Sequence, residues 1–161
     1  MQWLAQREHS RAELQRKLLP HARALVAQAQ AGAATDAVDA PPPGEVMARV
    51  TELLDWLEAN RYLSQQRFAE SRIHARAARH GNLRIRQELA QHGIALDADA
   101  AQALQASEFD RAREVWSRKF QAPAADAAAR TRQARFLSSR GFSPETVRRV
   151  LRAEGSPADE D

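Results

Sequence analysis

The residues of this sequence best suited to chemistry are arginines that have few acidic neighbours. Arg72, Arg76 and Arg79 are four and three residues apart, so in a helix they lie on one face. Residues 61–86 contain seven arginines and one acidic residue, which leaves most of these guanidinium groups without a local carboxylate. A guanidinium group binds phosphate or carboxylate oxygens through paired hydrogen bonds. The pattern therefore predicts a surface that binds a DNA backbone or an acidic protein.

Eleven arginines are the candidates for this anion-binding surface. One group lies between residues 67 and 86, and a second group repeats the pattern between residues 132 and 149. The eleven are Arg67, Arg72, Arg76, Arg79, Arg84, Arg86, Arg132, Arg135, Arg140, Arg148 and Arg149. The alternative is a solvated helix face with intrahelical ion pairs, such as one between Glu70 and Arg67.

A third interpretation of this region is that it reads base edges. The short helix expected after Gly81 follows a tight break, as the recognition helix of a helix-turn-helix does. Asn82, Arg84 and Gln87 could supply the amide and guanidinium groups for such reading at the start of that helix. Three-helix units serve more often as scaffolds, so binding to a phosphate backbone or to protein is the preferred interpretation.

Aromatic residues could also contact nucleic acid, because bases stack on aromatic rings in single-strand binding proteins. Most of the aromatic residues of this chain recur on apolar helix stripes, which favours packing in a core. The candidates are Tyr62, Phe68, Trp116, Phe120, Phe136 and Phe142. Tyr62 and Trp3 are the least constrained by the apolar pattern.

No catalytic or metal site is predicted. The five histidines show neither an HExxH arrangement nor a cluster with carboxylates at ligand spacing, and the chain has no cysteine. The sequence contains no phosphate-binding glycine loop, nucleophile elbow or convergent carboxylate pair. We therefore expect neither an enzyme, nor a metal ion, nor a cofactor.

Composition indicates an all-α protein of 161 residues with a segregated charge. Alanine is abundant while glycine and β-branched residues are few, which favours helix over long windows. The formal net charge is +3, but residues 61–153 carry +9 and the last eight residues carry four acids. The chain has no long apolar segment and no cysteine, so we expect a cytoplasmic protein that does not cross a membrane.

Apolar periodicity and capping residues divide the chain into helices. Ser10 and Glu13 form a capping-box pattern at the start of the first long helix, and Pro20 is expected to interrupt or kink it. Residues 31–44 contain three consecutive prolines and no apolar period, which predicts a flexible loop. The further helices are expected over residues 45–59, 64–80, 82–92, 97–120 and 124–140, and from Pro144 onward.

A similar string of residues occurs three times along the chain. In each string a basic residue ends one helix, a small residue makes a break, and two apolar residues four apart follow, which are Leu14/Leu18, Ile85/Leu89 and Val147/Leu151. This predicts an elongated, curved array of tandem three-helix repeat units. The expected units are residues 1–60 with the loop 31–44, residues 61–122, and a partial third unit over residues 123–155, followed by an acidic tail, 156–161, that is expected to be disordered.

Seven strings occur in a characteristic order along the chain: Arg7-Glu8-His9-Ser10-Arg11-Ala12-Glu13-Leu14, Arg61-Tyr62-Leu63, Arg67-Phe68-Ala69, Gly81 through Ile94, Trp116-Ser117-Arg118-Lys119-Phe120, Arg132-Gln133-Ala134-Arg135-Phe136-Leu137 and Arg140-Gly141-Phe142-Ser143. In these strings the sequence resembles, over residues 2–152, the RecX family of bacterial regulators of the recombinase RecA. The chain departs from the family at Gln65-Gln66, where an aspartate is common, and in the loop 31–44, which resembles an insertion.

The resemblance implies tandem three-helix units and a non-enzymatic role. That role is to bind RecA and its nucleoprotein filament and to restrain recombinase, ATPase and co-protease activity in DNA repair, recombination and the SOS response. We expect a monomer that has RecA and the RecA–DNA filament as partners, and we allow for weak direct binding to DNA.

Two other functions remain open at this point. The chain could be an arginine-rich regulator that binds DNA directly, without RecA. It could also be a helical adaptor whose arginine excess reflects a GC-rich genome. Tight binding to naked DNA with a steep salt dependence would favour the first of these two.

Overall fold

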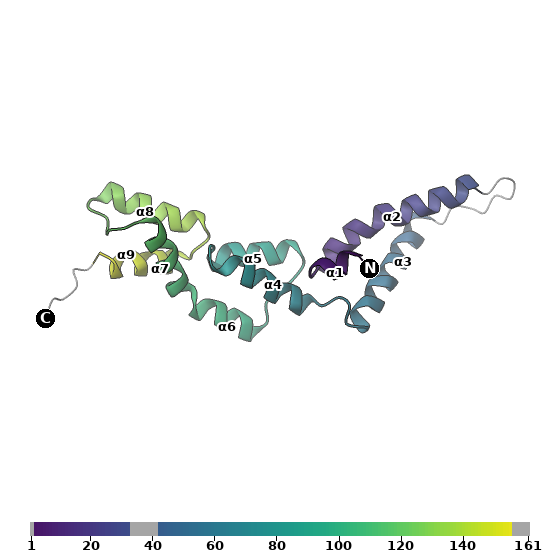
Figure 1. Cartoon of the computed structure of the whole chain (residues 1–161), viewed down its shortest axis with the longest axis horizontal. Helices are drawn as coiled ribbons and strands as arrows, with labels where there is room; N and C mark the ends of the chain where they lie inside the picture. The colour runs from purple at the N-terminus through teal and green to yellow at the C-terminus, as the bar shows by residue number, and fades with distance from the viewer. Residues whose placement is uncertain (1, 33–41, 156–161) are drawn as a thin grey trace. The chain divides into compact units, whose positions relative to one another are not determined.

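The computed structural model describes residues 2–32 and 42–155, and these residues form helices without any strand (Figure 1). The all-α prediction is therefore confirmed for this part of the chain. The helices are α1 (Gln2–Gln6), α2 (Arg11–Gly32), α3 (Pro43–Ala59), α4 (Gln65–Ala77), α5 (Asn82–Gln91), α6 (Ala98–Ala106), α7 (Glu108–Lys119), α8 (Ala127–Ser139) and α9 (Pro144–Ala153). The predicted disordered tail, 156–161, lies outside the described residues.

The chain divides into two compact units, which we call the N-terminal unit (Met1–Phe68) and the C-terminal unit (Ala69–Asp161). In the N-terminal unit α2 packs against α3. The buried core of this unit consists of Leu14, Val50, Leu54, Leu57 and Leu63. Four of these residues lie on helices that the apolar periodicity predicted, because a stripe at helical spacing must be covered by a second helix to leave water, whereas Leu63 lies between α3 and α4.

The predicted capping box at the start of α2 is present. The backbone amide of Glu13 donates a hydrogen bond of 3.1 Å to the Ser10 hydroxyl, which satisfies one of the free amides of the first turn. The Ser10 side chain is fully buried, so this bond is protected from water.

The prediction that Pro20 interrupts the first long helix is wrong, because α2 continues through it to Gly32. Proline removes one backbone hydrogen bond, but the residue is exposed and the alanine-rich segment after it has high helix propensity. The loop prediction is wrong at both ends, since Ala31, Gly32, Pro43 and Gly44 are helical. Pro43 lies at the first position of α3, where no amide donor is needed. The middle of the predicted loop, 33–41, lies outside the described residues.

The predicted single helix over residues 97–120 is also wrong, because it is divided at Ser107 into α6 and α7. Near the break, two side chains donate hydrogen bonds to backbone carbonyls. The Ser107 hydroxyl donates 3.0 Å to the carbonyl of Ala103, and the Arg111 guanidinium donates 3.0 Å to the carbonyl of Leu104. Side-chain bonds of this kind compete with the regular backbone ladder of a helix.

In the C-terminal unit α7, α8 and α9 surround one core (Figure 1). Its buried residues are Ala112, Val115, Trp116, Leu137, Phe142, Val147, Val150 and Leu151. The predicted start of the last helix is confirmed: the Ser143 hydroxyl accepts a hydrogen bond of 3.2 Å from the amide of Thr146, and Pro144 follows the cap.

The aromatic candidates divide as the periodicity predicted. Phe68, Trp116 and Phe142 are buried, which removes them from contact with bases. Phe120 and Phe136 pack partly buried against the core of the C-terminal unit, so they too are core residues rather than a stacking platform. Tyr62 is the exception. It is 49% exposed and stacks on Trp56 with a centroid distance of 5.7 Å. The side chain of Trp3 lies outside the described part.

Candidate anion-binding surface

The first arginines of the predicted surface are held in ion pairs. Nε of Arg67 lies 2.7 Å from Glu8, and its Nη2 donates to the carbonyl of Arg61. Nε of Arg76 lies 2.9 Å from Glu88 of α5. Both carboxylates come from other segments of the chain. The alternative of a solvated face had assumed partners within the same helix. Both guanidinium groups are therefore partly neutralised, and Arg67 belongs to the N-terminal unit.

The second and third breaks of the repeated string meet in the C-terminal unit. The amide of Gly81 donates a hydrogen bond of 2.9 Å to the carbonyl of Arg140, and the amide of Leu83 donates one of 3.0 Å to the carbonyl of Gly141. The Arg140 guanidinium lies 3.5 Å from the carbonyl of Arg79. We call Gly81, Leu83, Arg140 and Gly141 the repeat joint. Two segments about sixty residues apart in sequence are thus paired through their backbones.

Both glycines of the repeat joint are required by geometry. Gly141 has a φ of +82°, and a Cβ added to it would lie 2.6 Å from the Cβ of Arg84. A Cβ added to Gly81 would lie 2.2 Å from the backbone nitrogen of Phe142. Real Cβ atoms do not approach other atoms this closely, so only glycine allows the two breaks to touch.

The repeat joint brings arginines of the two predicted groups together. Arg84 follows Gly81 on α5, and its backbone lies against Gly141, which directly follows Arg140. Several of the eleven candidates are exposed and take part in no ion pair among the residues that the structure describes. They are Arg79, Arg84, Arg86, Arg132, Arg135 and Arg148. Their charge is available to an anionic ligand.

The side chains of the three remaining candidates are stacked on an aromatic ring or partly buried. The Arg140 guanidinium lies over the ring of Phe136, 4.5 Å from its centroid, and that of Arg149 lies 4.6 Å from the centroid of Phe109. Stacking on a ring limits the side-chain conformations. In Arg140 the Nε atom is also buried and Nη1 donates to the carbonyl of Arg79, so only part of this guanidinium group is open to an anion. Arg72 is partly buried.

The positive potential at the repeat joint acts on a neighbouring histidine. Burial lowers the pKa of His80, and the nearby charges of Arg84 and Arg76 lower it further. All three effects disfavour the protonated ring. His80 is therefore neutral near pH 7, and the positive charge at the joint comes from arginines.

A buried carboxylate that the sequence analysis missed lies beneath the joint. Glu108 is only 1% exposed and accepts hydrogen bonds from the Asn82 amide (2.8 Å), the Ser143 hydroxyl (2.7 Å) and the Thr146 hydroxyl (2.8 Å). Burial raises the pKa of Glu108, but these hydrogen bonds outweigh it, and the net pKa lies below the ordinary value. A carboxylate is therefore held ionised between the first residues of α5 and α9.

Arg111, one turn after Glu108, donates hydrogen bonds to residues on either side of the start of α5 and near the end of α6. It donates 2.8 Å to the carbonyl of His80, 3.0 Å to that of Leu104, and also to the side-chain oxygen of Asn82. Burial lowers its pKa and the charge of Glu108 raises it. Its guanidinium group serves the structure and is not part of the exposed surface.

The base-reading interpretation is wrong for Asn82. This residue is 3% exposed, and its side chain bonds to Gln105 at 3.2 Å and to Arg111. A side chain buried and held in this way cannot reach a base. Arg84 and Gln87 are exposed as that interpretation required.

One sequence signal could have found Glu108. It lies four residues from both Leu104 and Ala112, so it falls on the apolar stripe of the predicted helix. A charged residue on such a stripe is almost never buried unless it is paired, which marks it as a candidate for a structural role. Its partners could not be predicted, because they come from α5 and α9.

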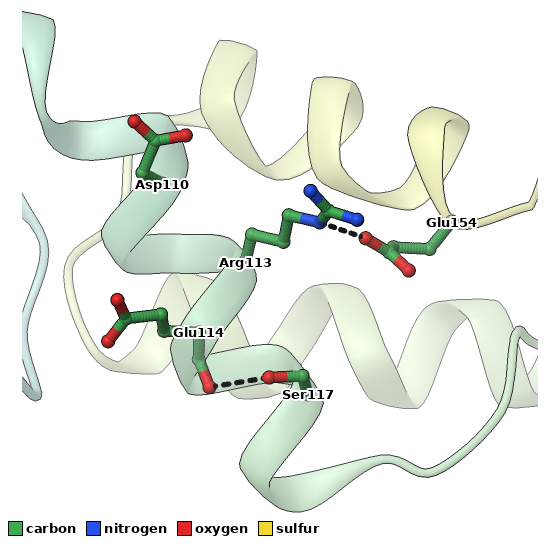
Figure 2. Close-up of a pocket in the computed structure, with 5 residues that line it drawn as sticks. All are labelled: Asp110, Arg113, Glu114, Ser117 and Glu154. Atoms are coloured by element: carbon green, nitrogen blue, oxygen red, sulfur yellow. Dashed lines mark hydrogen bonds and ion pairs between the residues drawn. The ribbon is translucent and has the colours of Figure 1, made fainter.

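A pocket on the same unit is acidic and adds nothing to the anion-binding surface. It is lined by Asp110, Arg113, Glu114, Ser117 and Glu154 (Figure 2). Figure 2 shows Arg113 directed toward Glu154, with 2.7 Å between Nε and the carboxylate. The Ser117 hydroxyl donates to the backbone carbonyl of Glu114, and the Glu114 carboxylate pairs with Arg118 at 3.0 Å.

Neither a metal-binding group nor a membrane-spanning helix is found in the part of the chain that the structure describes. No three His, Asp or Glu residues within 2–32 and 42–155 are grouped so that they could hold a metal ion. No helix of these residues is long and apolar enough to cross a bilayer.

Comparison with known proteins identifies the family. Residues 64–104, with α4, α5 and most of α6, match the second three-helix domain of RecX, and residues 106–151 match its third three-helix domain. The boundary between these matches falls at the break between α6 and α7. The predicted units, 61–122 and 123–155, place α7 in the second unit instead.

Whole-chain relatives give the same result. Each of three relatives is a Regulatory protein RecX: that of Ralstonia nicotianae is 43% identical over 98% of this chain and 87% of its own length. That of Leptothrix cholodnii is 45% identical over 100% and 90%. That of Herbaspirillum seropedicae is 46% identical over 94% and 85%. With this identity over nearly its whole length, the chain belongs to the RecX family of regulatory proteins.

Proposed function

We propose that this chain binds the recombinase RecA and its DNA filament and restrains recombinase, ATPase and co-protease activity in DNA repair and recombination. The observation that carries the proposal is the cluster of Arg79, Arg84 and Arg140 at the repeat joint. It occurs in a member of a family of regulatory proteins, in which a binding surface and not a catalytic site is expected to act.

The chemistry of such a filament suits this surface. A recombinase filament presents DNA phosphates together with acidic side chains, and guanidinium groups bind both through charge-assisted hydrogen bonds. Arg79 and Arg84 are exposed without an ion pair among the described residues, so binding displaces no internal partner. Residues 61–153 carry a net charge of +9, which attracts an anionic partner from a distance.

The proposal includes a mode of action without catalysis. The chain acts as a cytoplasmic monomer that occupies the filament and hinders its access to duplex DNA or its ATP turnover. Inhibition should then depend on how much of the filament is covered and should saturate when the sites are filled.

The test measures the DNA-dependent ATPase activity and strand exchange of purified RecA while this protein is added. We expect both activities to fall. The double variant Arg84→Ala/Arg140→Ala should inhibit about tenfold less well, because two charge-assisted contacts are lost. The matched control is Arg113→Ala/Arg118→Ala, which removes the same charge from exposed side chains that are paired with Glu154 and Glu114.

The control separates the surface from net charge. If Arg113→Ala/Arg118→Ala weakens inhibition as much as the variant at the joint, only the overall charge matters and the assigned surface is wrong. If the unmodified protein changes neither RecA activity at several-fold excess, the proposed function is wrong.

Direct binding to DNA is the second candidate, and the exposed arginines without ion pairs favour it. Each phosphate neutralised by an arginine releases a counterion, so affinity for naked DNA would fall steeply as salt is raised. Equal affinity for naked DNA and for the RecA–DNA filament would favour this candidate. Weak binding to naked DNA with tight binding to the filament would favour the first.

A further inference from the structure

The repeat joint fixes two helix starts side by side. α5 begins at Asn82 and α9 begins at Pro144, and each start lies directly after a break of the repeated string. Amides in the first turn of a helix have no partner inside the helix and must find one elsewhere. At α5 and α9 part of that need is met by one acceptor, the side chain of Glu108.

Glu108 belongs to neither of these helices, since it begins α7. One of its oxygens, Oε1, accepts from the amides of Asn82 (2.8 Å) and Ser143 (3.3 Å). The other, Oε2, accepts from the hydroxyls of Ser143 and Thr146. A single carboxylate therefore bonds to both sides of the joint, and its charge is favourable at two helix N-termini.

Arg111 adds the corresponding contact at a helix C-terminus. It donates to the carbonyl of Ala77, the last residue of α4, to that of His80, three residues later, and to the carbonyl of Leu104 near the end of α6. α7 thus contributes an anion for two helix starts and a cation for two helix ends. All four helices belong to the second or third three-helix domain or to the boundary between them.

We propose that Glu108 is a positioning residue that locks the second and third three-helix domains into one rigid body. Through the repeat joint it fixes the separation of Arg84 and Arg140. A ligand that spans both guanidinium groups then binds without ordering the two domains first, and this preorganisation increases affinity. The link to ligand affinity rests on the proposed function, whereas the rigidity does not.

Substitutions at Glu108 separate hydrogen bonding from charge. Glu108→Gln keeps an acceptor for the amides, and its NH2 group can donate to the two hydroxyls, so it loses the charge but keeps most bonds. Glu108→Ala leaves the amide and hydroxyl donors buried without a partner. We expect rigidity to decrease from the wild type to Glu108→Gln and further to Glu108→Ala.

Rigidity is measured with spin labels at Gln87→Cys on α5 and Ser138→Cys on α8. Both positions are exposed and the chain has no other cysteine, so labelling is specific. Pulsed electron resonance should give one narrow distance distribution in the otherwise unchanged protein. Glu108→Ala should broaden it, while circular dichroism at the same temperature still shows a helical protein. Glu108→Gln, the milder change, keeps the test valid should Glu108→Ala fail to fold.

Gln133→Leu is the control for a loss of stability elsewhere. The Gln133 side chain accepts a hydrogen bond of 3.0 Å from the indole of buried Trp116 and donates one of 3.3 Å to the carbonyl of Ala122, and neither partner belongs to the joint. The variant Gln133→Leu should lower the melting temperature and leave the distance distribution between the two spin labels narrow. A narrow distribution in both Glu108 variants, or equal broadening by Gln133→Leu, would overturn the proposal.

A binding measurement then tests the functional consequence. Below the melting temperature of every variant, Glu108→Ala should bind the RecA–DNA filament about tenfold more weakly, and Gln133→Leu should bind it as the wild type does. If Glu108→Ala broadens the distances but leaves filament affinity unchanged, rigidity is not used in binding. If even the wild type does not bind the filament, the proposed function fails, and the distance measurements still decide whether Glu108 locks the domains.

Discussion

The amide of Gly81 donates a hydrogen bond of 2.9 Å to the carbonyl of Arg140, and this bond joins equivalent breaks of two successive repeats. Each break lies between two helices of its own domain, where backbone groups are left without helical partners. Pairing one break with the next satisfies groups on both sides. It also places arginines that are distant in sequence on one surface.

Substituting the glycines of the joint should destabilise the protein by different amounts. Gly141→Ala combines the strain of a φ of +82° with a contact of 2.6 Å to Arg84, and we expect a loss of about 3–4 kcal/mol in the free energy of unfolding. Gly81→Ala has the close contact without the positive φ and should lose about 1–3 kcal/mol. Urea denaturation followed by circular dichroism measures both.

The chain contains a matched control for backbone strain. Gly93 has a φ of +72° at the end of α5, but a Cβ added there would meet nothing within 4 Å. Gly93→Ala should therefore lose only about 1–2 kcal/mol, the cost of the left-handed conformation. A loss as large as that of Gly141→Ala would show that the contact with Arg84 is unimportant.

Much of this fold could be predicted from the sequence, because apolar spacing and caps act locally. Of the six apolar positions in the repeated string, Leu14, Ile85, Leu89, Val147 and Leu151 are buried, and Leu18 packs partly buried against the core of the N-terminal unit. Propensity and spacing failed where particular side-chain hydrogen bonds decide the outcome. The break at Ser107 depends on hydrogen bonds from a side chain a turn away, and no propensity predicts it.

The candidate site shows the same division. Arginine spacing predicted a basic surface, and the exposed side chains of Arg79 and Arg84 agree with it. It could not predict that Arg67 and Arg76 pair with carboxylates from other segments, since those contacts need the fold. Asn82 was misassigned for the same reason, because the helix start that seemed open to a ligand is occupied by Glu108.

A buried hydrogen bond in the third domain predicts that a substitution of similar size lowers the stability of the protein. The indole N–H of Trp116 donates 3.0 Å to Oε1 of Gln133, and both side chains are buried. Gln133→Leu is similar in size but leaves the indole donor unsatisfied, which costs about 1–3 kcal/mol. Thermal unfolding followed by tryptophan fluorescence should show a lower melting temperature.

Acid should destabilise the N-terminal unit through Glu13. Burial raises the pKa of this carboxyl, but its hydrogen bond and ion pair with Arg7, and the nearby His9, lower it to about 2. The folded state therefore binds its proton less readily than the unfolded chain, whose pKa is near 4.5. The stabilisation is complete above pH 4.5 and is lost as the pH falls from 4.5 toward 2.

The variant Glu13→Gln checks this assignment. It should be less stable than the wild type at pH 7 by about 1–2 kcal/mol, a value reduced because Arg7 is half exposed. The difference should shrink toward zero as the pH approaches 2. A difference that stays constant across this range would mean that Glu13 acts through packing and not through its charge.

Arg11 joins the start of α2 to the end of α3, and its replacement tests how much this contact contributes. Its two Nη atoms lie 2.6 Å from Asp55 and 2.8 Å from Glu58, and these contacts raise its pKa. The Arg11 side chain is 28% exposed and that of Glu58 33%, so water screens this pair only in part, whereas Asp55 is 62% exposed. Arg11→Ala should lower the free energy of unfolding by about 1–2 kcal/mol. Two charge-assisted hydrogen bonds are lost, and the negative charges of Asp55 and Glu58 are left without the cation between them.

A surface ion pair on α3 provides the control for Arg11. Arg49 lies 2.6 Å from Glu45, but the two side chains are 69% and 43% exposed and four residues apart on one helix. Exposed pairs of this kind contribute about 0.3–0.5 kcal/mol, so Arg49→Ala should change the urea midpoint little. Raising the salt concentration should reduce what little effect it has, whereas the effect of Arg11→Ala should persist. Equal losses in the two variants would mean that burial and the bridge between helices add nothing to a simple surface pair.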